Sequence, residues 1–136
     1  MTTPDKKHKH LIVRAEISAP PSADDCAEVC RWFSRLVSTI RMKELAPPRA
    51  FYWDEVGNRG LTADVLLTTS NAVLHIWDEC VPAVAQIDVY SCADFTPEEV
   101  IGCLEVFGPS KVEFKFLDRD GGLTVVQESV PILYQR

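Results

Sequence analysis

A hydroxyl, an imidazole and a carboxylate lie close together near the middle of the chain, directly after an apolar run. Ser70 follows the run 65–67, His75 comes five residues later, and Glu79 comes four residues after the histidine. Side chains of a β-strand alternate between its two faces, so we expect His75, Trp77 and Glu79 on one face. Such groups suit nucleophilic and acid–base chemistry. A turn serine and a strand histidine are more often structural, however, so the spacing alone leaves both interpretations open.

Three adjacent aromatic residues precede this stretch and are further candidates for a site. Phe51, Tyr52 and Trp53 form an aromatic run that favours a short strand. Their rings would either stack on a ligand or pack on the two faces of a sheet. The sequence favours neither alternative.

Composition limits the classes of function. The 136 residues suit one domain with a real core, and the net charge of −6 argues against nucleic-acid binding. The one basic run, 6–10, is interpreted as a solvated, partly disordered end. We expect no membrane span and no signal peptide, because no long apolar run is present.

Five cysteines, an odd number, indicate reduced thiols and a cytoplasmic location. Cys26 and Cys30 lack a second matching pair, so we expect core packing and no metal site.

Hydrophobic periodicity places these groups on a sheet with two helices. Ser22 with Asp25 and Thr96 with Glu99 resemble capping boxes that begin the helices. The pattern predicts strands over 10–17, 50–53, 61–68, 72–77, 84–91 and 111–116, helices from Ser22 to about Met42 and over 97–107, and an irregular or edge strand within 123–136.

This order predicts one α+β domain over residues 1–136. It is a two-layer sandwich, an antiparallel sheet with two helices on one face. The second face then needs cover, and we expect a homodimer with the layers αββα.

With the elements placed, the chain resembles the prokaryotic S-adenosylmethionine decarboxylases from about Lys9 to Asp118. The spacing from Ser70 to His75 and from His75 to Glu79 matches that family. The resemblance is carried by His10-Leu11-Ile12-Val13, Gly60-Leu61-Thr62, Ser70, His75-Ile76-Trp77-Asp78-Glu79, Asp88-Val89-Tyr90-Ser91-Cys92, and the helix 97–107 with the strand 111–116.

The resemblance implies a proenzyme that cuts itself between Thr69 and Ser70. Ser70 would attack the preceding carbonyl and become a pyruvoyl group, the cofactor that forms a Schiff base with the substrate amine. Thr62 stands at a residue that assists processing, and His75 at the base that removes the α-proton. Cys92 stands at the proton donor of the decarboxylation.

The same resemblance implies S-adenosylmethionine as substrate and a place in spermidine synthesis. Glu79 would accept hydrogen bonds from the ribose, while Phe51, Tyr52 or Trp53 would stack on adenine.

Several positions depart from the family pattern beside the expected site. Thr69 stands where the family has glutamate, and Asp78 stands where it has proline. Extra residues lie around 80–82, and the turn 57–59 is longer. These departures leave two alternatives open: the same chemistry on another amino acid, such as arginine or ornithine, or a non-processing homologue that binds a ligand or a partner as a regulator.

Overall fold

The computed structural model describes residues 7–129 and 132–133, which form one antiparallel sheet and two α-helices. The sheet order is β2-β3-β4-β5-β1-β6-β7, and β8 pairs with β6. The strands are β1 (Lys9–Ile17), β2 (Arg49–Trp53), β3 (Gly60–Leu67), β4 (Ser70–Trp77), β5 (Ala83–Ser91), β6 (Pro109–Asp118), β7 (Thr124–Glu128) and β8 (Ile132–Leu133), and the helices are α1 (Cys26–Thr39) and α2 (Pro97–Cys103), with 3₁₀ turns at Ala23–Asp25 and Leu104–Phe107.

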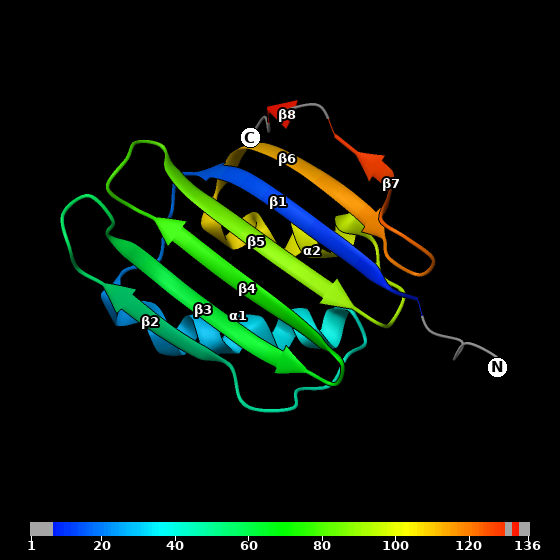
Figure 1. Ribbon diagram of the computed structural model, residues 1–136. Coiled ribbons are helices and arrows are strands. Elements are labelled where there is room, and N and C mark those ends of the chain that lie inside the picture. Colours follow the sequence, from blue (N-terminus) through cyan, green and yellow to red (C-terminus); the bar gives the residue numbers. More distant parts are fainter. Residues whose placement is uncertain (1–6, 130–131, 134–136) are drawn as a thin grey trace.

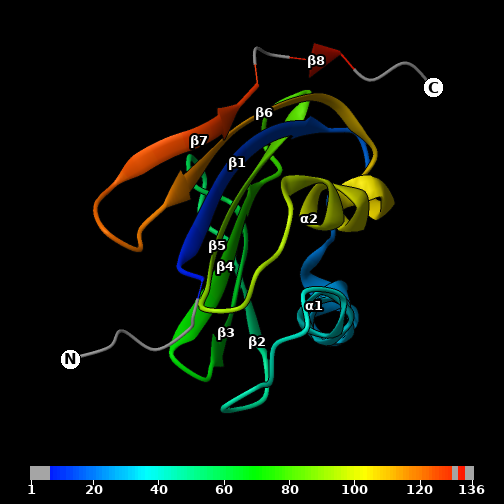
Figure 2. The ribbon, with the colours of Figure 1, turned by 90° about the vertical axis from the view of Figure 1, so that its right-hand side faces the viewer.

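The elements form two layers. Both helices lie behind the sheet in Figure 1, and the edge view in Figure 2 shows them on one side with the opposite face bare. The expected two-layer α+β sandwich with an antiparallel sheet is therefore confirmed. We call the face without helices the open face.

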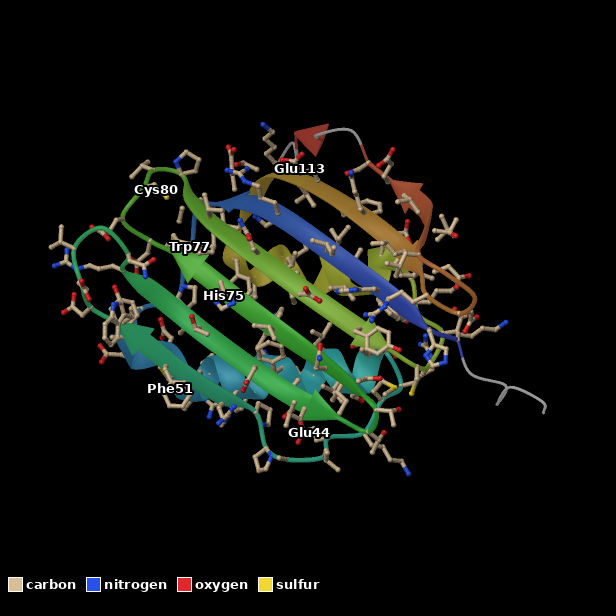
Figure 3. The ribbon with its side chains drawn as sticks, viewed as in Figure 1. Glu44, Phe51, His75, Trp77, Cys80 and Glu113 are labelled. Carbon is tan, nitrogen blue, oxygen red and sulfur yellow. The ribbon has the colours of Figure 1, made fainter. Side chains whose placement is uncertain are left out.

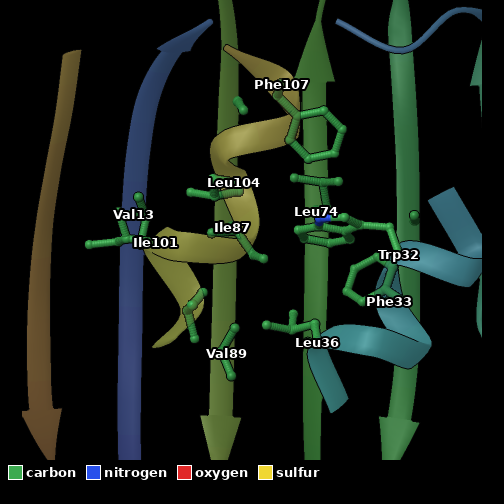
Figure 4. Packing of buried hydrophobic residues seen from close by; sticks show 14 of the residues in the cluster. Val13, Trp32, Phe33, Leu36, Leu74, Ile87, Val89, Ile101, Leu104 and Phe107 are labelled. Carbon is green, nitrogen blue, oxygen red and sulfur yellow. The ribbon is translucent and has the colours of Figure 1, made fainter. Parts of the chain in front are cut away.

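The core fills the space between the sheet and the helices. Alternate residues of each central strand are buried, as the period of two requires, and they meet the apolar stripe of α1. Figure 4 shows Phe33 and Leu36 of α1 packed over Leu74 of β4, with Ile101 and Leu104 over β5 and β1. Because this face of the central strands is occupied by packing, any chemistry there must come from the open face or from the strand ends.

The helix starts follow the expected capping boxes, but the helix ends differ. In each capping box, the hydroxyl of the first residue accepts a backbone N–H of the first helical turn, and the carboxylate of the acidic residue accepts the backbone N–H of the first residue. The pairs are Ser22 with Asp25 and Thr96 with Glu99. The first helix ends at Thr39 rather than near Met42, because Arg41 takes a left-handed conformation with φ 61°.

The two ends of the chain also refine the expectations. Lys9 and His10 belong to β1, and His8 Nδ1 lies 2.8 Å from the Tyr90 hydroxyl, so the end of the basic run is ordered in the sheet. The interpretation of this run as solvated and partly disordered is wrong for residues 8–10; residues 1–6 lie outside the described residues. The expected C-terminal edge strand is present as β7 and β8, while residues 130–131 and 134–136 lie outside the description.

Candidate functional site

The β3–β4 hairpin carries the central residues of the site. Its turn consists of Thr68 and Thr69, and Leu67 pairs with Ser70 across it. Thr69 has φ 56°, a left-handed conformation that costs an L-residue about 1–2 kcal/mol. A β-branched side chain makes that conformation still less favourable. The strain therefore lies in the residue that immediately precedes Ser70.

Ser70 and Cys92 lie together at this end of the sheet. The Cys92 backbone N–H donates a 2.9 Å hydrogen bond to Ser70 Oγ, and Ser70 is only 8% exposed. Cys92 Sγ lies 3.0 Å from Thr69 Oγ1 and 3.6 Å from the Thr68 carbonyl oxygen. A hydroxyl and a thiol thus flank the strained peptide between Thr69 and Ser70.

Thr62 and His75 form a separate pair on the open face. They are cross-strand partners, and Thr62 Oγ1 lies 3.0 Å from His75 Nδ1. Ser70 is five residues from His75 along β4, about 17 Å at ~3.4 Å per residue. An odd separation also puts the two side chains on opposite faces, as the alternating burial of β4 shows. The expectation that Thr62 and His75 lie within reach of Ser70 is therefore wrong within one chain.

An aromatic hollow of about 460 Å³ surrounds the Thr62–His75 pair. Figure 3 looks onto the open face and shows Phe51, His75 and Trp77 on it. The hollow is lined by residues of β2, β3 and β4 and of the β2–β3 loop, namely Phe51, Tyr52, Trp53, Asn58, Gly60, Thr62, His75, Ile76 and Trp77.

The β2–β3 loop fixes the two indoles of this hollow. Trp53 Nε1–H donates to Glu55 at 3.1 Å, and Trp77 Nε1–H donates to Asn58 Oδ1 at 3.0 Å. Because both indole N–H groups already donate hydrogen bonds within the protein, Trp53 and Trp77 offer mainly their ring faces to a ligand. The sequence did not indicate that Asn58 belongs to the site. The only available signal was an asparagine in a predicted turn near the strand that carries Trp77.

Glu79 lies just beyond β4 and ties the same loop to it. Its Oε1 accepts the Arg59 N–H at 2.8 Å and the Gly57 N–H at 2.9 Å. The hydrogen bond from Arg59, followed by that from Gly57, lowers the pKa of the Glu79 carboxyl. The side chain remains exposed, so Glu79 is an ionised acceptor in a neighbouring hollow that shares Trp77 with the aromatic hollow.

The departure at Asp78 has a structural role. Its carboxylate accepts a 2.8 Å hydrogen bond from the Tyr52 hydroxyl, which raises the pKa of Tyr52. Asp78 therefore joins the end of β4 to β2 beside the hollow.

Neither a metal cluster nor a membrane helix is found in residues 7–129 and 132–133. No three His, Cys, Asp or Glu side chains in that part of the chain come close enough together to hold a metal ion. No helix there is long and apolar enough to cross a membrane.

Comparison with known protein families identifies the family of this chain. The family model described as S-adenosylmethionine decarboxylase matches residues 9–120, which is most of the chain. The chain belongs to the S-adenosylmethionine decarboxylase family. The expectation of an enzyme of this family is thereby confirmed.

The fold agrees with a solved member of that family. The crystal structure of the adenosylmethionine decarboxylase from Aquifex aeolicus VF5 superposes with a TM-score of 0.62 at 17% identity, covering 93% of this chain and 98% of that one. No curated protein sequence matches this chain significantly. At 17% identity the superposition establishes the fold alone.

Proposed function

We propose that this protein is a self-processing, pyruvoyl-dependent decarboxylase of S-adenosylmethionine that supplies the aminopropyl donor for spermidine synthesis. The observation that carries the proposal is the environment of Ser70. Its hydroxyl adjoins a strained left-handed Thr69 and a thiol at the tip of a hairpin. Strain of this kind is typical of functional sites.

The residues around Ser70 fit a pyruvoyl group made from that serine. Ser70 opens β4 directly after the turn, where its hydroxyl can approach the Thr69 carbonyl, and the Cys92 N–H supports Ser70 Oγ. Once formed, the group would supply an electron sink for loss of carbon dioxide. Cys92, beside the same turn, would return a proton to the product, and Thr62 and His75 would serve the processing step.

The same geometry supports a homodimer. His75 is too far from the Ser70 of its own chain to act on it, and it lies on the face that no helix covers. Exposed apolar side chains on that face include Ile12, Phe51 and Leu66. We infer that two open faces pack together as αββα and that the partner's His75 and the partner's Thr62 reach Ser70.

The aromatic hollow suits the adenosyl part of the substrate. Trp53 and Phe51 are 59% and 62% exposed and offer ring faces for stacking on adenine. Glu79 Oε1 is occupied by two backbone N–H groups, while Oε2 accepts only one longer bond of 3.1 Å from Gly57. Oε2 is therefore the atom we assign to the ribose hydroxyls.

None of the five cysteines forms a disulfide, which supports a reducing compartment such as the cytoplasm.

Intact-mass measurement tests the proposal. Cleavage between Thr69 and Ser70 leaves pieces of 69 and 67 residues, the second blocked to Edman degradation by its pyruvoyl group. Ser70→Ala should remain one chain, with Thr68→Ala as the matched turn control that still cleaves. The cleaved protein should release carbon dioxide from S-adenosylmethionine in preference to arginine or ornithine.

The alternative is a non-processing homologue with a regulatory role. The replacement of the usual glutamate by Thr69 favours it, as does the distance between His75 and Ser70 within one chain. A wild-type protein that stays one chain after long incubation would establish this alternative instead.

A further inference from the structure

We propose that Lys43 and Lys7 form a cationic pocket that receives the Thr69 carboxylate as it leaves during self-cleavage. This inference rests on the proposed function and adds residues to its second chemical step. It concerns a hollow behind the hairpin turn that is separate from the aromatic hollow.

The pocket adjoins the peptide that is cut. Its volume is about 370 Å³. Its lining brings together three cationic side chains and the strained turn, namely Lys7, Arg41, Met42, Lys43, Thr68, Cys92, Ala93 and Asp94. Thr68 lies one residue before the carboxylate that cleavage would create.

Backbone pairing holds Lys43 beside the turn. The Thr68 N–H donates to the Lys43 carbonyl at 3.3 Å, and the Leu45 N–H donates to Leu66 at 2.8 Å. Glu44 forms a bridge with Leu67, and its carboxylate accepts a 2.6 Å bond from the Ser34 hydroxyl of α1. These contacts do not involve the bond that breaks, so Lys43 can stay beside Thr68, the neighbour of Thr69, before and after cleavage.

Lys7 is held on the other wall of the pocket. Its backbone N–H donates to the Cys92 carbonyl at 3.2 Å. Among the described residues, neither the Lys7 nor the Lys43 ammonium makes an ion pair. Arg41, by contrast, binds Glu99 and the Asp94 carbonyl, so the two lysines are the cations left for an incoming anion.

The two steps differ in the anion that they form: the first passes through a transient oxyanion at the Thr69 carbonyl, and only the second releases a lasting carboxylate. In the first step Ser70 Oγ bonds to the Thr69 carbonyl carbon, the C–N bond breaks, and the hydroxyl proton ends on the freed amine, giving a neutral ester linkage. In the second step a base takes the Ser70 α-proton and the Cβ–Oγ bond breaks. Its electron pair leaves with Thr69 as a carboxylate, and residue 70 becomes dehydroalanine. Tautomerisation to the imine, addition of water and loss of ammonia then give the keto group.

A cation beside Thr69 therefore lowers the barrier to the second step, in which the carboxylate separates, more than the barrier to the first step. The pocket provides that cation beside the residue that becomes the carboxylate. Asp94 also lines the pocket, so the pocket is not purely cationic.

The test is the double variant Lys7→Met with Lys43→Met. The ester should still form, while elimination slows about tenfold, as the loss of two exposed charge contacts would produce. The ester should accumulate and be cut by hydroxylamine to give a hydroxamate at Thr69, visible by mass. Lys43→Arg with Lys7→Arg should restore elimination, and added salt should slow elimination in the wild type more than in the double variant.

The controls separate this inference from the proposed function. Arg31→Met removes an exposed cation from α1, far from the turn, and should leave both steps unchanged. Accumulation of the ester in the double variant shows that it folds. If the wild type cleaves and the double variant eliminates equally fast, only this inference is overturned. If the wild type never cleaves, the proposed function falls and this inference with it.

Discussion

At the scale of single residues, Thr69 stores energy in the intact chain. Its φ of 56° is unfavourable for a β-branched residue, whereas asparagine tolerates that region well. In a Ser70→Ala background, which cannot be cut, Thr69→Asn should raise the free energy of unfolding by about 1 kcal/mol. Urea denaturation measures the change. Thr68→Asn, beside it but without a positive φ, should give no gain, and equal effects of the two would mean that no strain resides at Thr69.

Glu79 combines two tasks in one carboxylate. Glu79→Gln should weaken binding of S-adenosylmethionine or its methyl ester about tenfold, the typical loss for a charged hydrogen bond. Hydrogen exchange at Gly57 and Arg59 should quicken as well, since both N–H groups bind Oε1. Because the pKa of Glu79 is lowered, the wild-type contact should persist below the pH at which an ordinary carboxyl is protonated. Glu28→Gln, an exposed carboxylate on α1, is the control for calorimetry, and equal affinity of wild type and Glu79→Gln would remove Glu79 from the site.

At the scale of elements, one ion pair joins the end of α1 to the start of α2. Arg41 binds Glu99 through two nitrogens, at 2.8 and 3.1 Å. The Arg41 hydrogen bond lowers the pKa of Glu99 to about 2, with help from Thr96. A lowered pKa adds stability that is fully present above pH 4.5 and is lost as the pH falls toward 2.

Arg41→Met should therefore destabilise the protein at pH 7 by about 1 kcal/mol, since Arg41 is largely exposed. The difference from wild type should shrink as the pH falls toward 2, leaving only the contribution of the Arg41 bonds to the Thr39 and Asp94 carbonyls, which thermal unfolding across pH would show. Arg31→Met breaks the exposed pair with Glu28 and should cost less than half as much. A constant difference at every pH would exclude the Arg41–Glu99 pair as its cause.

The elements were largely predictable from the sequence, because capping residues and alternation of apolar residues act locally. The boundaries that differed depend on single backbone conformations, such as the left-handed Arg41 that ends the first helix. The grouping of the site was only half predictable. His75 and Ser70 point to opposite faces because β4 begins at Ser70, whereas the predicted strand over 72–77 left Ser70 in the preceding turn. The contact between Ser70 and Cys92, however, depends on which strands are neighbours, and no local pattern specifies that.

At the scale of the whole molecule, the separation of Ser70 from His75 gives a test of the dimer. Ser70→Ala and His75→Ala chains should each remain uncleaved when expressed alone. In mixed dimers, the His75→Ala chain keeps its Ser70 and gains the partner's His75, so that chain should be cut. Mass spectrometry of co-expressed, differently tagged chains identifies which one is processed. Absence of cleavage in the mixture, or a monomer by light scattering, would contradict the shared site.

The strand order also determines what becomes of the two pieces once the turn is cut. The N-terminal piece contributes β1, β2 and β3, and the C-terminal piece contributes β4 to β8. β1 lies between β5 and β6 and pairs with both along its whole length. A strand of the first piece is thus inserted between two strands of the second, and the β3–β4 pairing remains as well. Cleavage of the backbone would therefore leave a single folded unit. Its two pieces would separate only when the whole sheet unfolds.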